Sequence, residues 1–69
     1  MSNRQAARKL ARKQFGKHPD FRARYAEGSR SLGDFIESII LYNLENNEKE
    51  ASFWRAEMKT FFPDFTETV

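Results

Sequence analysis

The chain of 69 residues contains no cysteine and a single histidine, His18. Without cysteine, a disulfide framework and a thiolate metal site are excluded, and one histidine leaves too few ligands for a structural zinc site. A domain of this size buries only about 60% of its unfolded surface, and small domains usually add disulfides or metals to compensate. We therefore expect no metal and no cofactor, and stability from helix packing, self-association or a bound partner.

Long apolar runs are also missing. The longest covers residues 39–42, whereas a membrane-spanning helix needs roughly 18 apolar residues. The basic N-terminal stretch is not followed by an apolar signal core, and the lack of cysteine is compatible with the cytoplasm. We expect one soluble, cytoplasmic domain over residues 1–69 that does not contact a membrane.

The residues that catalysis needs are scarce. His18 is followed by Pro19 and Asp20, but no nucleophile is placed with them, and a catalytic arrangement needs nucleophile, base and orienting group together. A histidine in a surface turn is the simpler interpretation. The three glycines do not form a phosphate-binding loop. We expect no catalytic residue and no enzyme.

Charge is distributed unevenly along the chain, although the net charge is only +2. Residues 1–30 carry nine cations against two carboxylates, a net charge of +7, and residues 31–69 carry three cations against eight carboxylates, a net charge of −5. Such asymmetry suggests an acidic partner for the first half. The alternative is internal, with the basic half packed beside the acidic half.

Four segments have helical periodicity and none alternates cleanly, which predicts an all-α fold, a small bundle of three to four short helices. Glycine, asparagine and proline separate the segments, and three segments begin with a capping side chain followed three residues later by a polar one. The pairs are Ser2 with Gln5, Ser31 with Asp34, and Asn47 with Glu50. The expected helices cover about 3–15, 19–27, 32–46 and 48–62.

The segment 32–46 has the widest apolar surface. Its apolar arc spans roughly 200°, well beyond an ordinary surface stripe, so it must be covered on two sides. It is either a central core helix, or a core helix with a self-association face. The second interpretation predicts a homodimer through Tyr42, Phe35 and Leu41. The alternative is that Phe65 and the tail fold back over this flank and leave a monomer.

The segment 3–15 has alanine on one face and cations on the other, a pattern that indicates phosphate binding. An acidic protein surface or a merely solvated face are the alternatives. Phe15, Phe21 and Tyr25 lie among the cations, as in surfaces that stack unpaired bases, although Phe21 and Tyr25 could instead form the buried face of 19–27. The predicted binding residues are Arg4, Arg8, Lys9, Arg12, Lys13, Lys17, Arg22, Arg24 and Arg30.

The segment 48–62 carries a narrow apolar stripe that includes Trp54, with Phe53 beside it. Exposed aromatic side chains are common anchors of protein interfaces, so Tyr42, Phe53 and Trp54 are candidate interface residues. Burial of the stripe against 32–46 is the alternative.

Two stretches resemble known families. Residues 26–36 resemble the turn and second helix of ribbon-helix-helix DNA-binding proteins, but the family's DNA-reading strand has no counterpart before them. Residues 8–13 with His18, Pro19 and Asp20 are similar to the basic helix and HPD loop of J-domain co-chaperones, which implies that they bind a heat-shock chaperone. Gly16 and Lys17 are an apparent insertion there, and the family's first helix is missing.

These features predict a small non-enzymatic nucleic-acid-binding or regulatory protein that uses its basic N-terminal helix. The alternative is a small inhibitor or adaptor that binds a larger protein through the basic face or the C-terminal aromatic residues.

Overall fold

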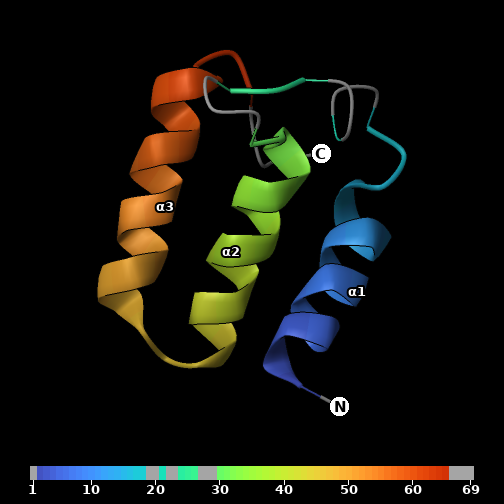
Figure 1. Ribbon diagram of the computed structural model, residues 1–69, viewed down its shortest axis with the longest axis vertical. Helices are drawn as coiled ribbons and strands as arrows, with labels where there is room; N and C mark the ends of the chain where they lie inside the picture. Colours follow the sequence, from blue (N-terminus) through green and yellow to red (C-terminus); the bar gives the residue numbers. More distant parts are fainter. Residues whose placement is uncertain (1, 19–20, 22–23, 27–29, 66–69) are drawn as a thin grey trace.

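The computed structural model describes residues 2–18, 21, 24–26 and 30–65, and this part of the chain contains three helices. They are α1 (Asn3–Phe15), α2 (Leu32–Leu44) and α3 (Glu48–Phe61). Figure 1 shows α2 between the other two, with each helix running opposite to the next. The predicted all-α bundle is confirmed with three helices. None of the described helices is long and apolar enough to cross a membrane.

The helix starts are those that the capping residues predict. The Ser2 hydroxyl accepts a hydrogen bond from the backbone N–H of Gln5, and the Gln5 side chain accepts one from the backbone N–H of Ser2. Such reciprocal bonds satisfy backbone donors that a helix start leaves unpaired. The starts of α2 and α3 are capped by Ser31 and Asn47.

The helix ends differ slightly from the prediction. α2 ends at Leu44 rather than at residue 46. Asn46 has a φ of 56°, a left-handed conformation that asparagine tolerates better than most residues and that cannot continue a right-handed helix. The chain therefore reverses over two asparagines and enters α3 at Glu48.

The predicted helix 19–27 is wrong where the structure describes it. Phe21 and residues 24–26 are not helical, and Tyr25 forms an antiparallel β-bridge with Ser31. The backbone N–H of Ala26 donates to the carbonyl of Arg30 at 2.7 Å, and that of Leu32 to the carbonyl of Arg24 at 3.1 Å. Residues 19–20, 22–23 and 27 lie outside the described residues. Nine residues are too few for a stable isolated helix. The backbone of this segment instead pairs with the residues at the start of α2 in the same chain.

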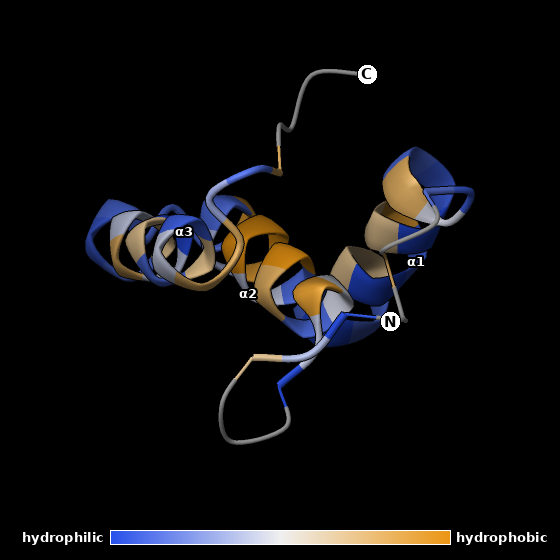
Figure 2. Ribbon diagram, turned by 90° about the horizontal axis from the view of Figure 1, so that it is seen from above, coloured by the Kyte–Doolittle hydropathy of each residue, from blue (hydrophilic) through white to orange (hydrophobic). Residues whose placement is uncertain are grey.

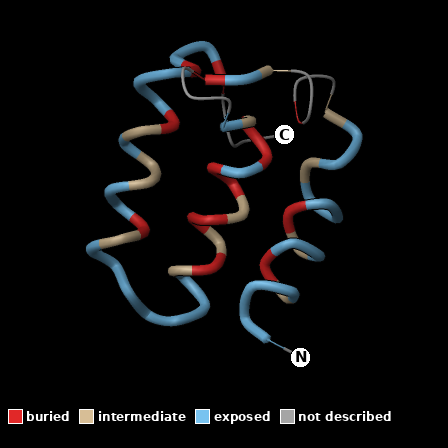
Figure 3. The backbone as a smooth tube through the Cα atoms, viewed as in Figure 1, coloured by how far each residue is buried: buried red, intermediate tan, exposed pale blue. Residues whose placement is uncertain are grey.

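α2 is the central helix, as the width of its apolar arc predicts. It packs against both α1 and α3, and these two helices do not pack against each other in the described part of the chain. Figure 2 shows the apolar residues concentrated on α2, and Figure 3 shows buried positions on the facing sides of all three helices. The buried apolar residues of α2 are Leu32, Phe35, Ile36, Ile39 and Leu41.

The outer helices and the tail complete the core. α1 contributes Ala7 and Ala11, while α3 contributes Met58, and Phe62 follows directly after α3. Phe65 is buried as well, with its ring centroid 5.9 Å from that of Phe15. The tail residue therefore does fold back onto the core.

The self-association face predicted on α2 is wrong. Phe35 and Leu41 are buried within the monomer, and Tyr42 is half-buried. The apolar arc is wide because α1 and α3 cover it from two sides, so little of it is left for a second copy. Large apolar side chains are exposed elsewhere, at Tyr25, Leu44, Phe53 and Phe61.

Candidate functional site

The nine predicted cations fall into groups with different surroundings. Arg4 and Arg8 lie on the edge of α1 that faces α2, and both contact the carboxylate of Glu37, at 3.4 Å and 3.5 Å. The Glu37 side chain is only 14% exposed, so this anion is largely removed from water and needs its partners. These two arginines therefore attach α1 to α2.

Arg24 also has an internal role. Its guanidinium donates two hydrogen bonds of 2.9 Å to the carboxylate of Asp64 and lies 5.0 Å from the ring centroid of Phe62. The hydrogen bond from Arg24 is the main reason that the pKa of Asp64 is lowered from its usual 3.8. The pair ties the connection between α1 and α2 to the residues after α3.

Arg30 holds the same connection to α3 by a different contact. Its guanidinium lies 4.5 Å from the ring centroid of Trp54 and 5.8 Å from that of Phe35. A cation over an aromatic face contributes about 0.5–1 kcal/mol where it is exposed. The internal interpretation of the charge asymmetry therefore applies to Arg4, Arg8 and Arg24, which pair with carboxylates of the acidic half. Arg30 is used inside the fold through aromatic rings instead.

The remaining described cations are different. They are exposed, and in the described structure they have no hydrogen bond, ion pair or ring contact. Helix geometry places those on α1 opposite Ala7 and Ala11, the two alanines that face α2. Arg22 lies outside the described residues. We call this set the basic face; it consists of Lys9, Arg12, Lys13 and Lys17.

A cleft of about 350 Å³ opens beside the basic face, between α1 and the start of α2. Arg8 and Arg12 line one wall, and Asp34 and Glu37 line the other. Tyr25, 63% exposed, also lines the cleft. The linear sequence gave no signal for the two carboxylates, because they come from a helix more than twenty residues further along the chain.

The three aromatic residues that lie among the cations of residues 1–30 differ in their burial. Phe21 is buried and Phe15 packs against the core, so both are structural. Tyr25 is the exception, because it forms an isolated β-bridge with Ser31 instead of lying in a helix, and its side chain is exposed. Of the three, only Tyr25 offers an exposed ring beside the cations.

The predicted protein-interface residues are only partly exposed. Phe53 is 52% exposed, whereas Tyr42 and Trp54 are half-buried. The Trp54 ring packs 6.0 Å from Phe35 and 5.2 Å from Phe53, and its buried Nε1 has no hydrogen-bond partner in the described part. Trp54 is thus mainly a core residue, and Phe53 is the member that a partner can reach.

His18 packs edge-on against Phe65 at 5.2 Å, while Pro19 and Asp20 lie outside the described residues. Among the residues that the structure describes, no cluster of histidine and carboxylate side chains could hold a metal ion. Comparisons with protein-family models, with curated proteins and with solved structures give no match.

Proposed function

We propose that this chain is a small non-enzymatic nucleic-acid-binding protein that contacts phosphates through the basic face, on α1 and the turn after it. The observation that carries the proposal is that the predicted cations divide into an internally paired group and an exposed group. Four of the nine are used inside the fold, and another four, Lys9, Arg12, Lys13 and Lys17, are exposed on α1 and the turn after it, without an internal partner among the described residues.

The spacing of these cations supports a polyanionic ligand. Lys9 and Lys13 lie four residues apart within α1, and like charges at this spacing destabilise a helix by a few tenths of a kcal/mol. A bound phosphate backbone would remove that repulsion. From Lys9 to Lys13 the helical rise is about 6 Å, a length along which duplex DNA carries several phosphates. Lys17 follows in the turn after α1.

The test is the salt dependence of binding to a short DNA duplex. If all four cations neutralise a phosphate, the slope of log K against log salt should be about −3.6, at −0.9 per phosphate. Replacing Lys9 and Lys13 together by alanine should weaken binding and flatten the slope by about 1.8. Neither side chain has an internal partner among the described contacts, and alanine favours helix, so the fold should remain intact.

The matched control removes two positive charges from α3, by Lys49→Ala together with Lys59→Ala. Both variants have the same net charge, so a loss specific to the α1 variant shows that the position of the charges matters. Equal losses in both would reduce the effect to overall charge and contradict the proposal. In a lysate, capture of a nucleic-acid ligand should disappear after nuclease treatment.

Tyr25 provides a separate prediction for single strands. The exposed ring stands in the cleft that Arg8 and Arg12 line, and stacking of a base on such a ring contributes about 1–3 kcal/mol. Tyr25→Ala should weaken binding to single-stranded DNA by that amount and leave duplex binding unchanged. Tyr25→Phe keeps the ring and should bind normally. Equal affinity of all three proteins for single strands would remove Tyr25 from the site.

A second candidate function is an adaptor that docks on a larger protein. It is favoured by the exposure of Phe53 and Phe61 on α3, since exposed aromatic residues anchor protein interfaces. Binding through these rings should change little with salt, whereas phosphate binding should weaken steeply. The salt titration therefore separates the two candidates.

A further inference from the structure

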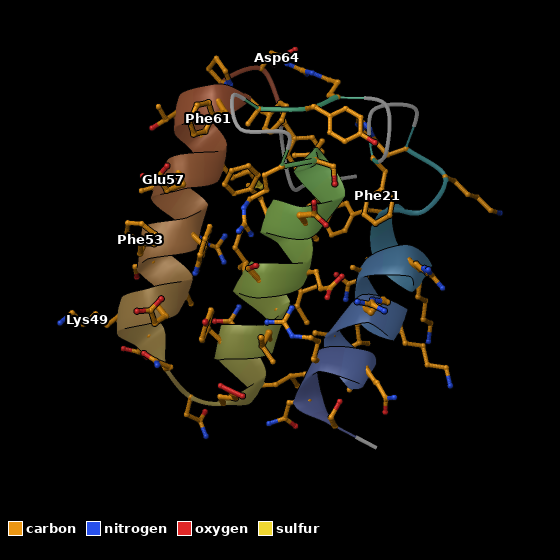
Figure 4. The ribbon with its side chains drawn as sticks, in the orientation of Figure 1. Phe21, Lys49, Phe53, Glu57, Phe61 and Asp64 are labelled. Atoms are coloured by element: carbon orange, nitrogen blue, oxygen red, sulfur yellow. The ribbon has the colours of Figure 1, made fainter. Side chains whose placement is uncertain are left out.

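The outer side of α3 carries a row of four exposed or partly exposed residues. Lys49, Phe53, Glu57 and Phe61 follow at intervals of four, and Figure 4 shows them one above another along the helix. Phe53 is 52% exposed and Phe61 36%. Within the described structure neither Lys49 nor Glu57 has an ion pair or hydrogen bond. We call this row the α3 stripe.

The charges of the α3 stripe are complementary to those of a second α3 stripe that runs antiparallel to it. Lys49 and Glu57 lie at equal distances, four residues each, on the two sides of Phe53. If two α3 helices lie antiparallel with Phe53 opposite Phe53, each Lys49 faces the Glu57 of the other copy. A parallel arrangement would instead place like charges together. Within one chain the pair cannot form, because eight residues of helix separate the two side chains by about 12 Å.

Small side chains beside Phe53 leave room for a second helix. Ala56 and Thr60 lie on the same side of α3 as Phe53, and the Thr60 hydroxyl donates to the carbonyl of Ala56 at 2.9 Å. Small side chains with a satisfied hydroxyl allow two helices to approach closely.

We propose that the α3 stripe is a self-association surface for a second copy of this chain, bound in a two-fold, antiparallel arrangement. A two-fold interface uses the same patch on both copies and must complement itself, which the order Lys49, Phe53, Glu57 does. One helix face is smaller than the roughly 800 Å² per partner of a standard interface, so the dimer is weak and forms at high protein concentration. The inference does not depend on the proposed function, because α1 lies on the other side of α2 (Figure 1).

The test is sedimentation equilibrium of charge-reversed variants from roughly 20 µM to 1 mM, the range suited to a small, weak interface. The wild-type mass should rise above the monomer's 8.1 kDa. Lys49→Glu alone and Glu57→Lys alone should each weaken association about tenfold, through loss and reversal of two exposed ion pairs. An equimolar mixture of the two variants should associate again, because opposite charges then meet at both positions. The double variant should also associate.

Both single variants should fold, since each adds a charge that the helix dipole favours, negative near the start of α3 and positive nearer its end. Phe53→Ser should remain folded, by circular dichroism, and monomeric. A mass of 8.1 kDa across the whole range would overturn the proposal. Unchanged association of Lys49→Glu, or a mixture that does not recover, would overturn it as well, because the contact would then lie elsewhere.

Discussion

Replacement of Phe35 by alanine is expected to lower the free energy of unfolding by about 3–5 kcal/mol, the usual range for truncating a buried phenylalanine. The side chain is only 3% exposed, and its ring centroid lies 5.9–6.0 Å from those of Trp54, Phe61 and Phe62. Such aromatic pairs contribute about 0.5–1.5 kcal/mol beyond the area that they bury. A chain of this length has about 3.5–10 kcal/mol of stability in total, so the variant should be close to unfolding at room temperature.

Urea denaturation measures this loss, and Phe53→Ala is the matched control. It deletes the same atoms from a side chain that is 52% exposed, so at micromolar concentration it should change the stability by less than about 0.5 kcal/mol. If both variants lost the same amount, Phe35 would not be the centre of the packing between α2 and α3.

Ile36→Ala and Ile39→Ala should each lower the free energy of unfolding by about 2–5 kcal/mol. Both side chains are buried on α2, which α1 and α3 cover from two sides. If α1 or α3 moved to fill the space left by the deleted side chain, the packing of α2 against the other helix would be disturbed. A cavity therefore remains.

Thermal unfolding followed by far-ultraviolet circular dichroism measures this loss. A loss of 2 kcal/mol should lower the melting temperature of a domain of this size by at least roughly 8 °C. Leu44→Ala removes a comparable side chain that is 43% exposed and should melt within a few degrees of wild type. A shift of only a degree or two in the two isoleucine variants would contradict the central position of α2.

The positions of the helices follow from local chemistry, and they could be predicted. Ser2, Ser31 and Asn47 each accept a hydrogen bond from the backbone three residues later, an interaction that depends only on neighbouring residues. The central role of α2 could also be predicted, because its apolar arc is too wide for a helix with one neighbour.

The connection between α1 and α2 could not be predicted in the same way. The spacing of Phe21 and Tyr25 fits a helical face, but Tyr25 pairs with Ser31 and only Phe21 is buried. The backbone of this short segment reaches its partners from the residues before α2, and Arg24 is held by Asp64, forty residues away. Those contacts exist only once the helices have packed.

The sequence by itself determined that the chain forms capped helices around an apolar middle one and that its positive charge is concentrated in the first half. Only the tertiary structure decided which cations remain for a ligand. Glu37 engages Arg4 and Arg8 across 33 and 29 residues, while Lys9 and Lys13 on the same helix have no such partner. Helix formation depends on near neighbours, whereas the pairing of a surface charge depends on which helix packs beside it, and that is set by the whole core.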